Sequence, residues 1–279
     1  MRAERDGVRV YWPMDPEHHR LPYDGQYRVK FSYLAFDDFG PDDVDYWRGM
    51  REAQLPNVGL LDEVASASNF DPLLVGRYAD VLEAITRVPR LLQTMGVTHV
   101  ASDRAWPSGE PAHSSGSVTF YRLPNVLDRA WIVPAGRHVR PGESLAILTA
   151  PGFDPGAEVL LEGTLTGEPG RMHKGVTSAQ LALQDGPNCV TIRATVEAPG
   201  YLVLADTWYP GWQATVDGEP AELLRANHAF RALHVEAGEH QIEMHYRPRS
   251  ILVGGAISLT VLILLSFGML VVHRETVQP

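Results

Sequence analysis

One uninterrupted apolar segment constrains this chain more than any other feature. Residues 251–272 read ILVGGAISLTVLILLSFGMLVV, and these 22 residues include no charged side chain. As an α-helix they would be about 33 Å long, enough to cross the roughly 30 Å hydrocarbon core of a bilayer. Apolar runs of this length are rare in the cores of soluble proteins. The sequence therefore predicts a membrane protein with one transmembrane helix at residues 251–272 and the lipid bilayer as its partner.

The two ends of the chain leave the topology open. The first twenty residues, MRAERDGVRVYWPMDPEHHR, lack the apolar stretch of a signal peptide, and the tail after the apolar segment is residues 273–279. Two interpretations remain. One is a tail-anchored protein with a cytoplasmic body. The other is the last piece of a longer membrane protein, whose earlier transmembrane helices, missing or split off, would be partners of this one. The positive-inside rule does not decide, because Arg247 and Arg249 precede the segment and Arg274 follows it.

Composition excludes several other classes of protein. The formal net charge is −10, which argues against a nucleic-acid partner. The single cysteine, Cys189, excludes an internal disulfide and a cysteine-based zinc site. The eleven histidines show no metal-binding spacing, and phosphate-binding glycine loops and serine-nucleophile motifs are absent. We therefore expect no metal site, no cofactor and no catalytic residue in this chain.

Residues 1–150 predict a small mixed α/β region, so that the fold class is α+β. Apolar residues recur at helical spacing over residues 42–52 and 72–86. Gly96 follows a short helical pattern and precedes the strand-like residues 97–101. A helix, a glycine and a strand in that order are typical of an α/β element.

Residues 151–248 predict an antiparallel β-sandwich. Over residues 190–197 apolar and polar side chains alternate strictly, as expected of a strand with one buried face. Asp217-Gly218 is a strong signal for a two-residue hairpin. Short strand-like segments recur about every 10–12 residues, the spacing typical of a sandwich.

The end of this region resembles the C-terminal end of the YfhO-type bacterial membrane proteins. The motifs that carry the resemblance are a strand ending in the acidic Asp206, then YPGW at 209–212, VDG at 216–218, RANHAFRA at 225–232, AGEH at 237–240 and YRP at 246–248. Upstream, LPNVGLLDEVASASNFDPLLVGRYADVLE and MGVTHVASDR are also similar to the outer domain of that family.

The resemblance implies a glycosyltransferase-like protein of the GT-C type, which uses a polyprenyl-phosphate sugar donor to modify cell-envelope polymers. Family members have many spans, with an acidic catalytic residue in an early outer loop. This chain has one apolar segment and no such loop, so no catalytic residue carries over. The resemblance thus implies an extracytoplasmic C-terminal portion plus the last transmembrane helix, accessory to sugar transfer at the cell membrane, with an envelope polymer as partner.

Four residues are candidate contacts for a glycan or polymer. Trp208, Tyr209 and Trp212 cluster around a Pro-Gly turn, and aromatic faces stack on sugar rings. Arg225 would add a cation. Alternation favours the other interpretation for Trp212, a place in the sandwich core with Ala214. The alternative function is a single-span β-sandwich binding module that contacts envelope glycan or a partner protein.

Overall fold

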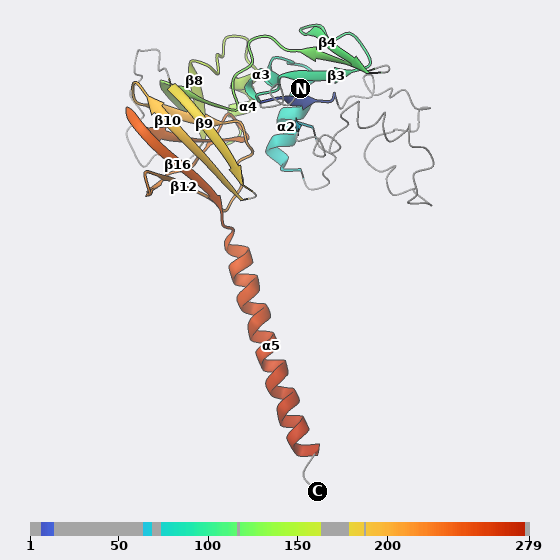
Figure 1. The fold of residues 1–279 in the computed structure, drawn as a ribbon, viewed down its shortest axis with the longest axis vertical. Helices are drawn as coiled ribbons and strands as arrows, with labels where there is room; N and C mark the ends of the chain where they lie inside the picture. The colour runs from blue at the N-terminus through green and yellow to red at the C-terminus, as the bar shows by residue number, and fades with distance from the viewer. Residues whose placement is uncertain are drawn as a thin grey trace.

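The computed structural model describes residues 7–13, 64–68, 74–115, 118–162, 179–186 and 188–276. The helix predicted at 42–52 lies outside these residues. Three β-sheets, three short helices and one long helix make up the described chain (Figure 1). The α+β fold class with a β-rich C-terminal region is confirmed.

Sheet A, the first of the three sheets, comes from the N-terminal part of the chain. Its five strands have the order β2-β1-β3-β5-β4, with β2, β1 and β3 parallel to one another and β5 and β4 antiparallel. Their bounds are β1 Arg9–Tyr11, β2 Ala65–Ser66, β3 His99–Ser102, β4 Glu110–Ser115 and β5 Val118–Arg122. Before β3, Gly96 has a φ of +65°, the left-handed conformation that glycine adopts readily after a helix.

Sheet B has six strands in the order β6-β11-β15-β14-β8-β7. All neighbours are antiparallel except β7 and β8, which are parallel. The bounds are β6 Ala130–Val133, β7 Ala135–Val139, β8 Glu158–Glu162, β11 Gly200–Leu204, β14 Leu224–Ala226 and β15 Phe230–Val235. The sheet thus joins strands from both sides of residue 150, where the sequence suggested a domain boundary. That division of the chain remains a prediction.

Sheet C is entirely antiparallel and has the strand order β13-β12-β16-β10-β9. The bounds are β9 Ala179–Gly186, β10 Cys189–Val196, β12 Trp212–Val216, β13 Glu219–Ala221 and β16 Gly238–Tyr246. The alternation predicted over 190–197 is present, since Val190, Ile192, Ala194 and Val196 are buried. Asp217-Gly218 forms the predicted hairpin with φ of +54° and +84°.

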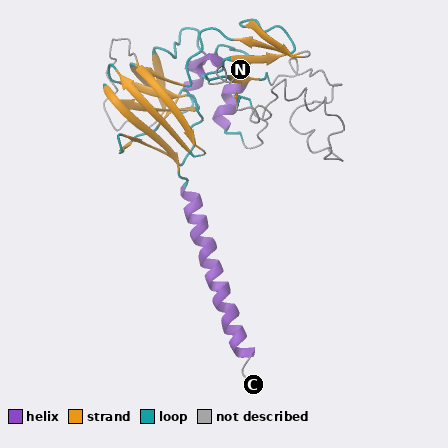
Figure 2. Ribbon diagram, in the orientation of Figure 1, coloured by secondary structure: helices purple, strands orange, loops and turns teal. Residues whose placement is uncertain are grey.

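Sheets B and C pack face to face and form the predicted sandwich. Its core consists of apolar side chains from both sheets, among them Ile192, Leu202, Leu233, Ile242 and Met244, each at most 1% exposed. The alternate residues of sheet B point to its other face. That face packs on α2 (Gly76–Ile85), α3 (Leu91–Thr94) and α4 (Ser144–Thr149) in the largest core cluster, which also includes residues of sheet A. Figure 2 shows the helices between the two groups of strands.

The long helix α5, Arg249–Thr276, leaves the sandwich directly after β16 and projects away from the body (Figure 1). Its residues 249–266 have a mean hydropathy of 1.9, and none of them is buried against the rest of the protein. Among the described residues it is the one helix long and apolar enough to cross a membrane. The helix begins two residues earlier than the predicted segment. We call residues 246–249, which join β16 to α5, the neck.

The alternation on β10 makes a direct prediction about stability. Ile192 is fully buried in the sandwich, so Ile192→Ala should lower the free energy of unfolding by about 2–5 kcal/mol. Its neighbour Arg193 lies on the exposed face of sheet C, so Arg193→Ala should change that free energy by less than about 0.5 kcal/mol. Thermal or urea unfolding of the full chain in detergent measures both. Equal losses at the two positions would show that the strand register is wrong.

Candidate functional site

The four predicted contact residues do not form one platform. Trp208 and Arg225 belong to a polar cluster on sheet B, whereas Tyr209 and Trp212 both lie against Tyr246 of the neck. Trp212 also stacks on Arg231 of a second charged cluster.

Trp208 and Arg225 contact each other directly. The guanidinium carbon of Arg225 lies 4.2 Å from the centre of the Trp208 ring, a cation–π arrangement. The Trp208 backbone N–H donates a hydrogen bond of 2.7 Å to the carbonyl of Ala229, which fixes the tryptophan beside the loop between β14 and β15. Both side chains are half-buried.

Glu162, at the end of β8, is the buried carboxylate of this cluster. Its side chain is 2% exposed and forms ion pairs with Arg77 at 2.8 Å and with Arg225 at 3.5 Å, and it also accepts a hydrogen bond from Ser144. Burial by itself would raise the pKa of Glu162, but the hydrogen bonds from Ser144 and Arg77 and the charge of Arg77 lower it below its ordinary value. The carboxylate is therefore held ionised inside the protein.

His228 lies next to Glu162 on a strained backbone. Asn227 and His228 both have left-handed φ values, +44° and +75°, which are costly for residues other than glycine. The ring Nδ1 of His228 is 3.2 Å from the Arg77 guanidinium and 3.0 Å from Ser144 Oγ, and Nε2 is 3.0 Å from Asp80 Oδ2. The contacts with Arg77, which can only donate, and with the Asp80 carboxylate fit the tautomer that carries its proton on Nε2.

Ser144, His228 and Asp80 contact one another in the order of a hydrolytic triad. The serine, however, is not exposed as the nucleophile of such a triad would be. Ser144 is fully buried and is shared with Glu162, so its hydroxyl is not presented to solvent. What the cluster does present at the surface is Arg77, Arg225 and Asp80, whose side chains are 27%, 26% and 52% exposed. The exposed charged side chains thus lie over a layer of buried polar groups. This arrangement suits the binding of a ligand by the charged groups better than nucleophilic attack by Ser144.

A second cluster centres on Asp206, at the end of β11. Its carboxylate forms ion pairs with Arg129 at 2.6 Å, Arg231 at 3.1 Å and Arg9 at 3.3 Å. Arg129 also pairs with Asp185 of β9. Asp206 thus connects Arg9 of sheet A, Arg231 of sheet B and, through Arg129, Asp185 of sheet C.

The charges in this cluster shift one another's proton affinities. Burial would raise the pKa of Asp206, but the hydrogen bond and charge of Arg129 and the charges of Arg9 and Arg231 lower it below its ordinary value. Burial lowers the pKa of Arg231 to about 10, and the nearby Asp206 opposes this shift. Arg231 also stacks on the Trp212 ring at 3.9 Å, so Trp212 links the charged cluster to the sandwich core that it packs against.

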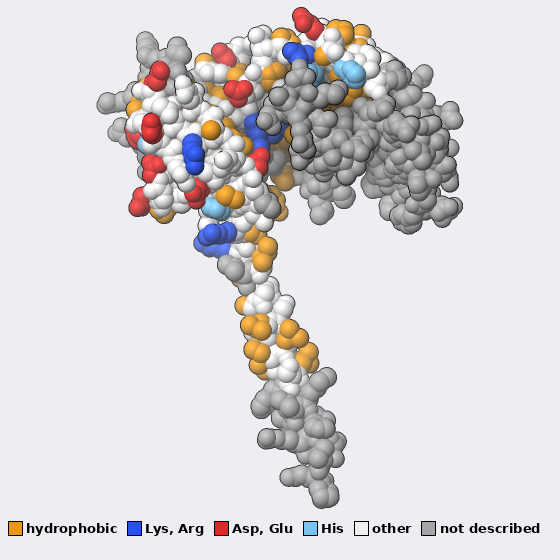
Figure 3. Space-filling model, viewed as in Figure 1, with side chains coloured by type: hydrophobic (Ala, Val, Ile, Leu, Met, Phe, Trp, Pro, Cys, Tyr) orange, Lys and Arg blue, Asp and Glu red, His pale blue; other side chains and the backbone are white. Residues whose placement is uncertain are grey.

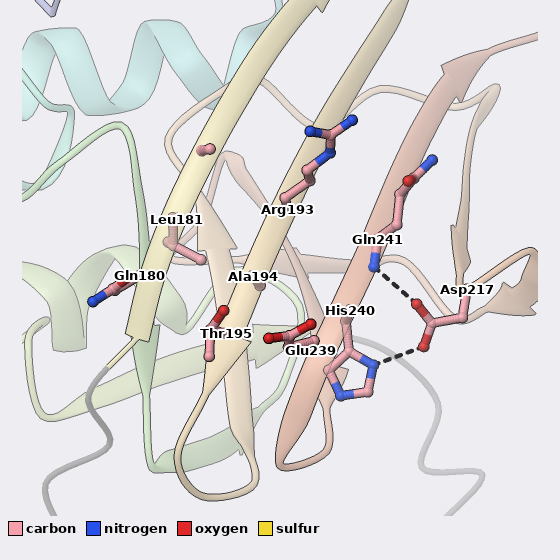
Figure 4. Close-up of a pocket in the computed structure, with 10 residues that line it drawn as sticks. Gln180, Leu181, Arg193, Ala194, Thr195, Asp217, Glu239, His240 and Gln241 are labelled. Atoms are coloured by element: carbon pink, nitrogen blue, oxygen red, sulfur yellow. Dashed lines mark hydrogen bonds and ion pairs between the residues drawn. The ribbon is translucent and has the colours of Figure 1, made fainter.

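A shallow hollow of about 600 Å³ lies on the outer face of sheet C (Figure 4). Arg193 and Thr195 of β10 and Gln241 of β16 line it. At its rim His240 Nδ1 is 2.7 Å from Asp217 Oδ2, and the Gln241 backbone N–H donates to Asp217 Oδ1. The backbone hydrogen bond from Gln241 and the contact with His240 lower the pKa of Asp217. These contacts tie the turn of the β12–β13 hairpin to β16.

Sequence reasoning found Trp208 and Arg225 but missed their partners. Glu162, Arg77 and Ser144 lie 18 to 151 positions away from the residues they contact, so local spacing carries no signal for them. The one available signal was the motif RANHAFRA itself, which contains a histidine between two buried apolar positions.

The fold combines a β-rich body with one helix long and apolar enough to cross a membrane. These two features define the class as a membrane-associated protein. Residues 174–258 match the family model described as bacterial membrane protein YfhO. The match confirms the resemblance over all of sheet C and the start of α5. No curated protein and no solved structure matches the chain significantly.

The residues outside the match complete the two clusters. Asp206, Arg225 and Arg231 lie inside it, whereas their partners Arg9 and Glu162 do not. The matched segment and the rest of the body are therefore packed as one structural unit.

The Asp206 cluster makes the second prediction. Asp206→Asn leaves three arginines without their shared counter-charge, so the free energy of unfolding should fall by about 3–5 kcal/mol. Because the pKa of Asp206 is lowered in the folded state, its stabilisation is present above the ordinary pKa, near pH 4, and is lost as pH falls below that value.

Urea unfolding of the full chain in detergent between pH 3 and about pH 7 measures both effects. The wild type should lose stability steeply below about pH 4, and Asp206→Asn should show a shallower decline. The exposed Glu236→Gln serves as the control, with little change expected. A steep acid decline of equal size in Asp206→Asn would contradict the assignment.

Proposed function

We propose that this chain is the extracytoplasmic C-terminal portion, with the final membrane helix, of a YfhO-like membrane protein, and that it assists the transfer of lipid-linked sugars onto cell-envelope polymers. The observation that carries this proposal is the family match at 174–258, which spans the five strands of sheet C and continues into α5. The similarity thus includes the C-terminal part of the body and the start of the apolar helix that follows it.

The position of α5 supports an accessory role. The helix leaves the body directly after β16, so the body stays at the membrane surface. A polyprenyl-linked donor has its lipid chain in the bilayer and its phosphate and sugar at that surface. Tethering confines an acceptor-binding body to the same layer and raises its effective concentration there. In this account the body holds the acceptor polymer near the donor, and the chemistry belongs to other parts of the system.

Trp208 and Arg225 are the residues we propose for polymer contact. Together they present a flat indole and a guanidinium, a combination that suits sugar rings and anionic groups such as phosphate. The buried Glu162 holds the guanidinium in place, so the pair is oriented before a ligand arrives. Tyr209 and Trp212 flank the same turn but face other environments.

The second candidate is a binding module that contacts envelope glycan or a partner protein independently of sugar transfer. The polar hollow on sheet C favours it, because Arg193 and its neighbours offer hydrogen-bonding groups on an open sheet face.

The test is performed in cells that carry the full native locus. Deleting the gene should remove a sugar from one envelope polymer, measured by composition analysis of the purified polymers. Arg225→Ala should reduce that sugar while the chain remains at normal abundance in the membrane. Arg87→Ala, exposed in the turn after α2, is the matched control and should leave the sugar unchanged.

Two results would contradict the proposal. An unchanged sugar content in every polymer after deletion would remove the link to sugar transfer. Normal transfer in Arg225→Ala, combined with loss of polymer binding in Arg193→Ala, would favour the independent binding module instead.

A further inference from the structure

Tyr209 is unusual among the large apolar side chains of the body. Within the described residues, the exposed large hydrophobic side chains are those of α5 and Tyr209, which is 49% exposed. All the others belong to the apolar helix α5. Tyr209 shares their exposure although it lies about 40 positions before them in the sequence.

The turn that carries Tyr209 is fixed against the neck. The Arg247 backbone N–H donates a 2.8 Å hydrogen bond to the carbonyl of Gly211. Gly211 has a φ of +111°, and a Cβ there would lie 3.0 Å from the Cα of Pro248 and 3.1 Å from the Tyr246 ring. Only glycine permits this approach, so the turn sits at the foot of α5 in a defined position.

Aromatic and basic side chains gather at this junction. The Tyr246 ring lies 6.3 Å from that of Tyr209 and 5.5 Å from that of Trp212. Arg247 and Arg249 are exposed on the neck, and basic side chains are visible where the body meets α5 (Figure 3). Tyrosine and tryptophan are enriched at the headgroup level of bilayers, and arginine is attracted to anionic lipid surfaces.

We propose that Tyr209, with the neck, docks into the headgroup region of the bilayer that α5 crosses. The exposed apolar surface of α5 begins at Ile251, so its entry into the hydrocarbon places residues 246–249, and the turn packed on them, at headgroup depth. A second contact beside α5 sets the angle of the sandwich on the membrane. The distal hairpin at 217–218, at the other end of β12, then faces away from the lipid.

This inference is independent of the role in sugar transfer, since it requires only that α5 spans a bilayer. The test measures the depth of a nitroxide spin label at the exposed Pro210→Cys, which leaves Tyr209 in place, in a Cys189→Ser background. The full chain is reconstituted into vesicles of phosphatidylcholine with phosphatidylglycerol. The expected result is loss of collision with an aqueous nickel complex and gain of collision with oxygen. A label at Glu219→Cys on the distal hairpin is the control and should remain fully accessible to nickel.

If Pro210→Cys does not fold, judged by its melting transition, a label at Tyr209→Cys reports the depth of the same turn. Replacing phosphatidylglycerol by phosphatidylcholine alone should make the label shallower if Arg247 and Arg249 contribute through charge. An unchanged depth would assign the docking to the aromatic side chains. Nickel accessibility at 209 or 210 equal to that at 219, in both kinds of vesicle, would overturn the proposal.

Discussion

A single half-buried carboxylate, Asp206, connects all three sheets of the protein. It lies two residues after β11 of sheet B and attracts arginines from β1, from the segment before β6 and from β15. Three guanidinium groups in a half-buried space would repel one another without it. Because Arg129 also pairs with Asp185 of sheet C, this charged cluster links the three sheets in addition to the apolar cores that they share. The turn beside α5 is tied to the same cluster, since Trp212 stacks on Arg231.

Much of the local structure could be predicted from the sequence, because it depends on short-range patterns. Alternation over 190–197, the Asp217-Gly218 hairpin and the left-handed Gly96 are each determined by a few neighbouring residues. Sheet B could not be predicted in this way. Its order brings β6 and β7 beside strands that follow residue 157, including a parallel β7–β8 pair. Such pairing is decided by burial of both faces of the sheet, which no local window contains.

The candidate site shows the same division between local and long-range information. The residue types at 208–212 suggested a cluster of aromatic contacts, although strand alternation favoured a place for Trp212 in the sandwich core, against which it packs. Trp208 pairs with Arg225 over the buried Glu162, Trp212 stacks on Arg231, and Tyr209 faces the neck. The position of His228 depends on two consecutive residues with left-handed backbone conformations. Neither residue is a glycine, so the sequence carries no signal for this conformation. The charged partners come from three separate segments of the chain.

The central claim is that a rigid body stands on the outer side of the membrane at the foot of α5. It is tested most directly by thiol labelling of intact cells that express the full native locus. Glu236, in the turn before β16, is 71% exposed, so Glu236→Cys in a Cys189→Ser background offers one accessible thiol. The account predicts labelling by a membrane-impermeant maleimide before the cells are broken. Labelling that appears only after lysis would place the body in the cytoplasm and contradict it.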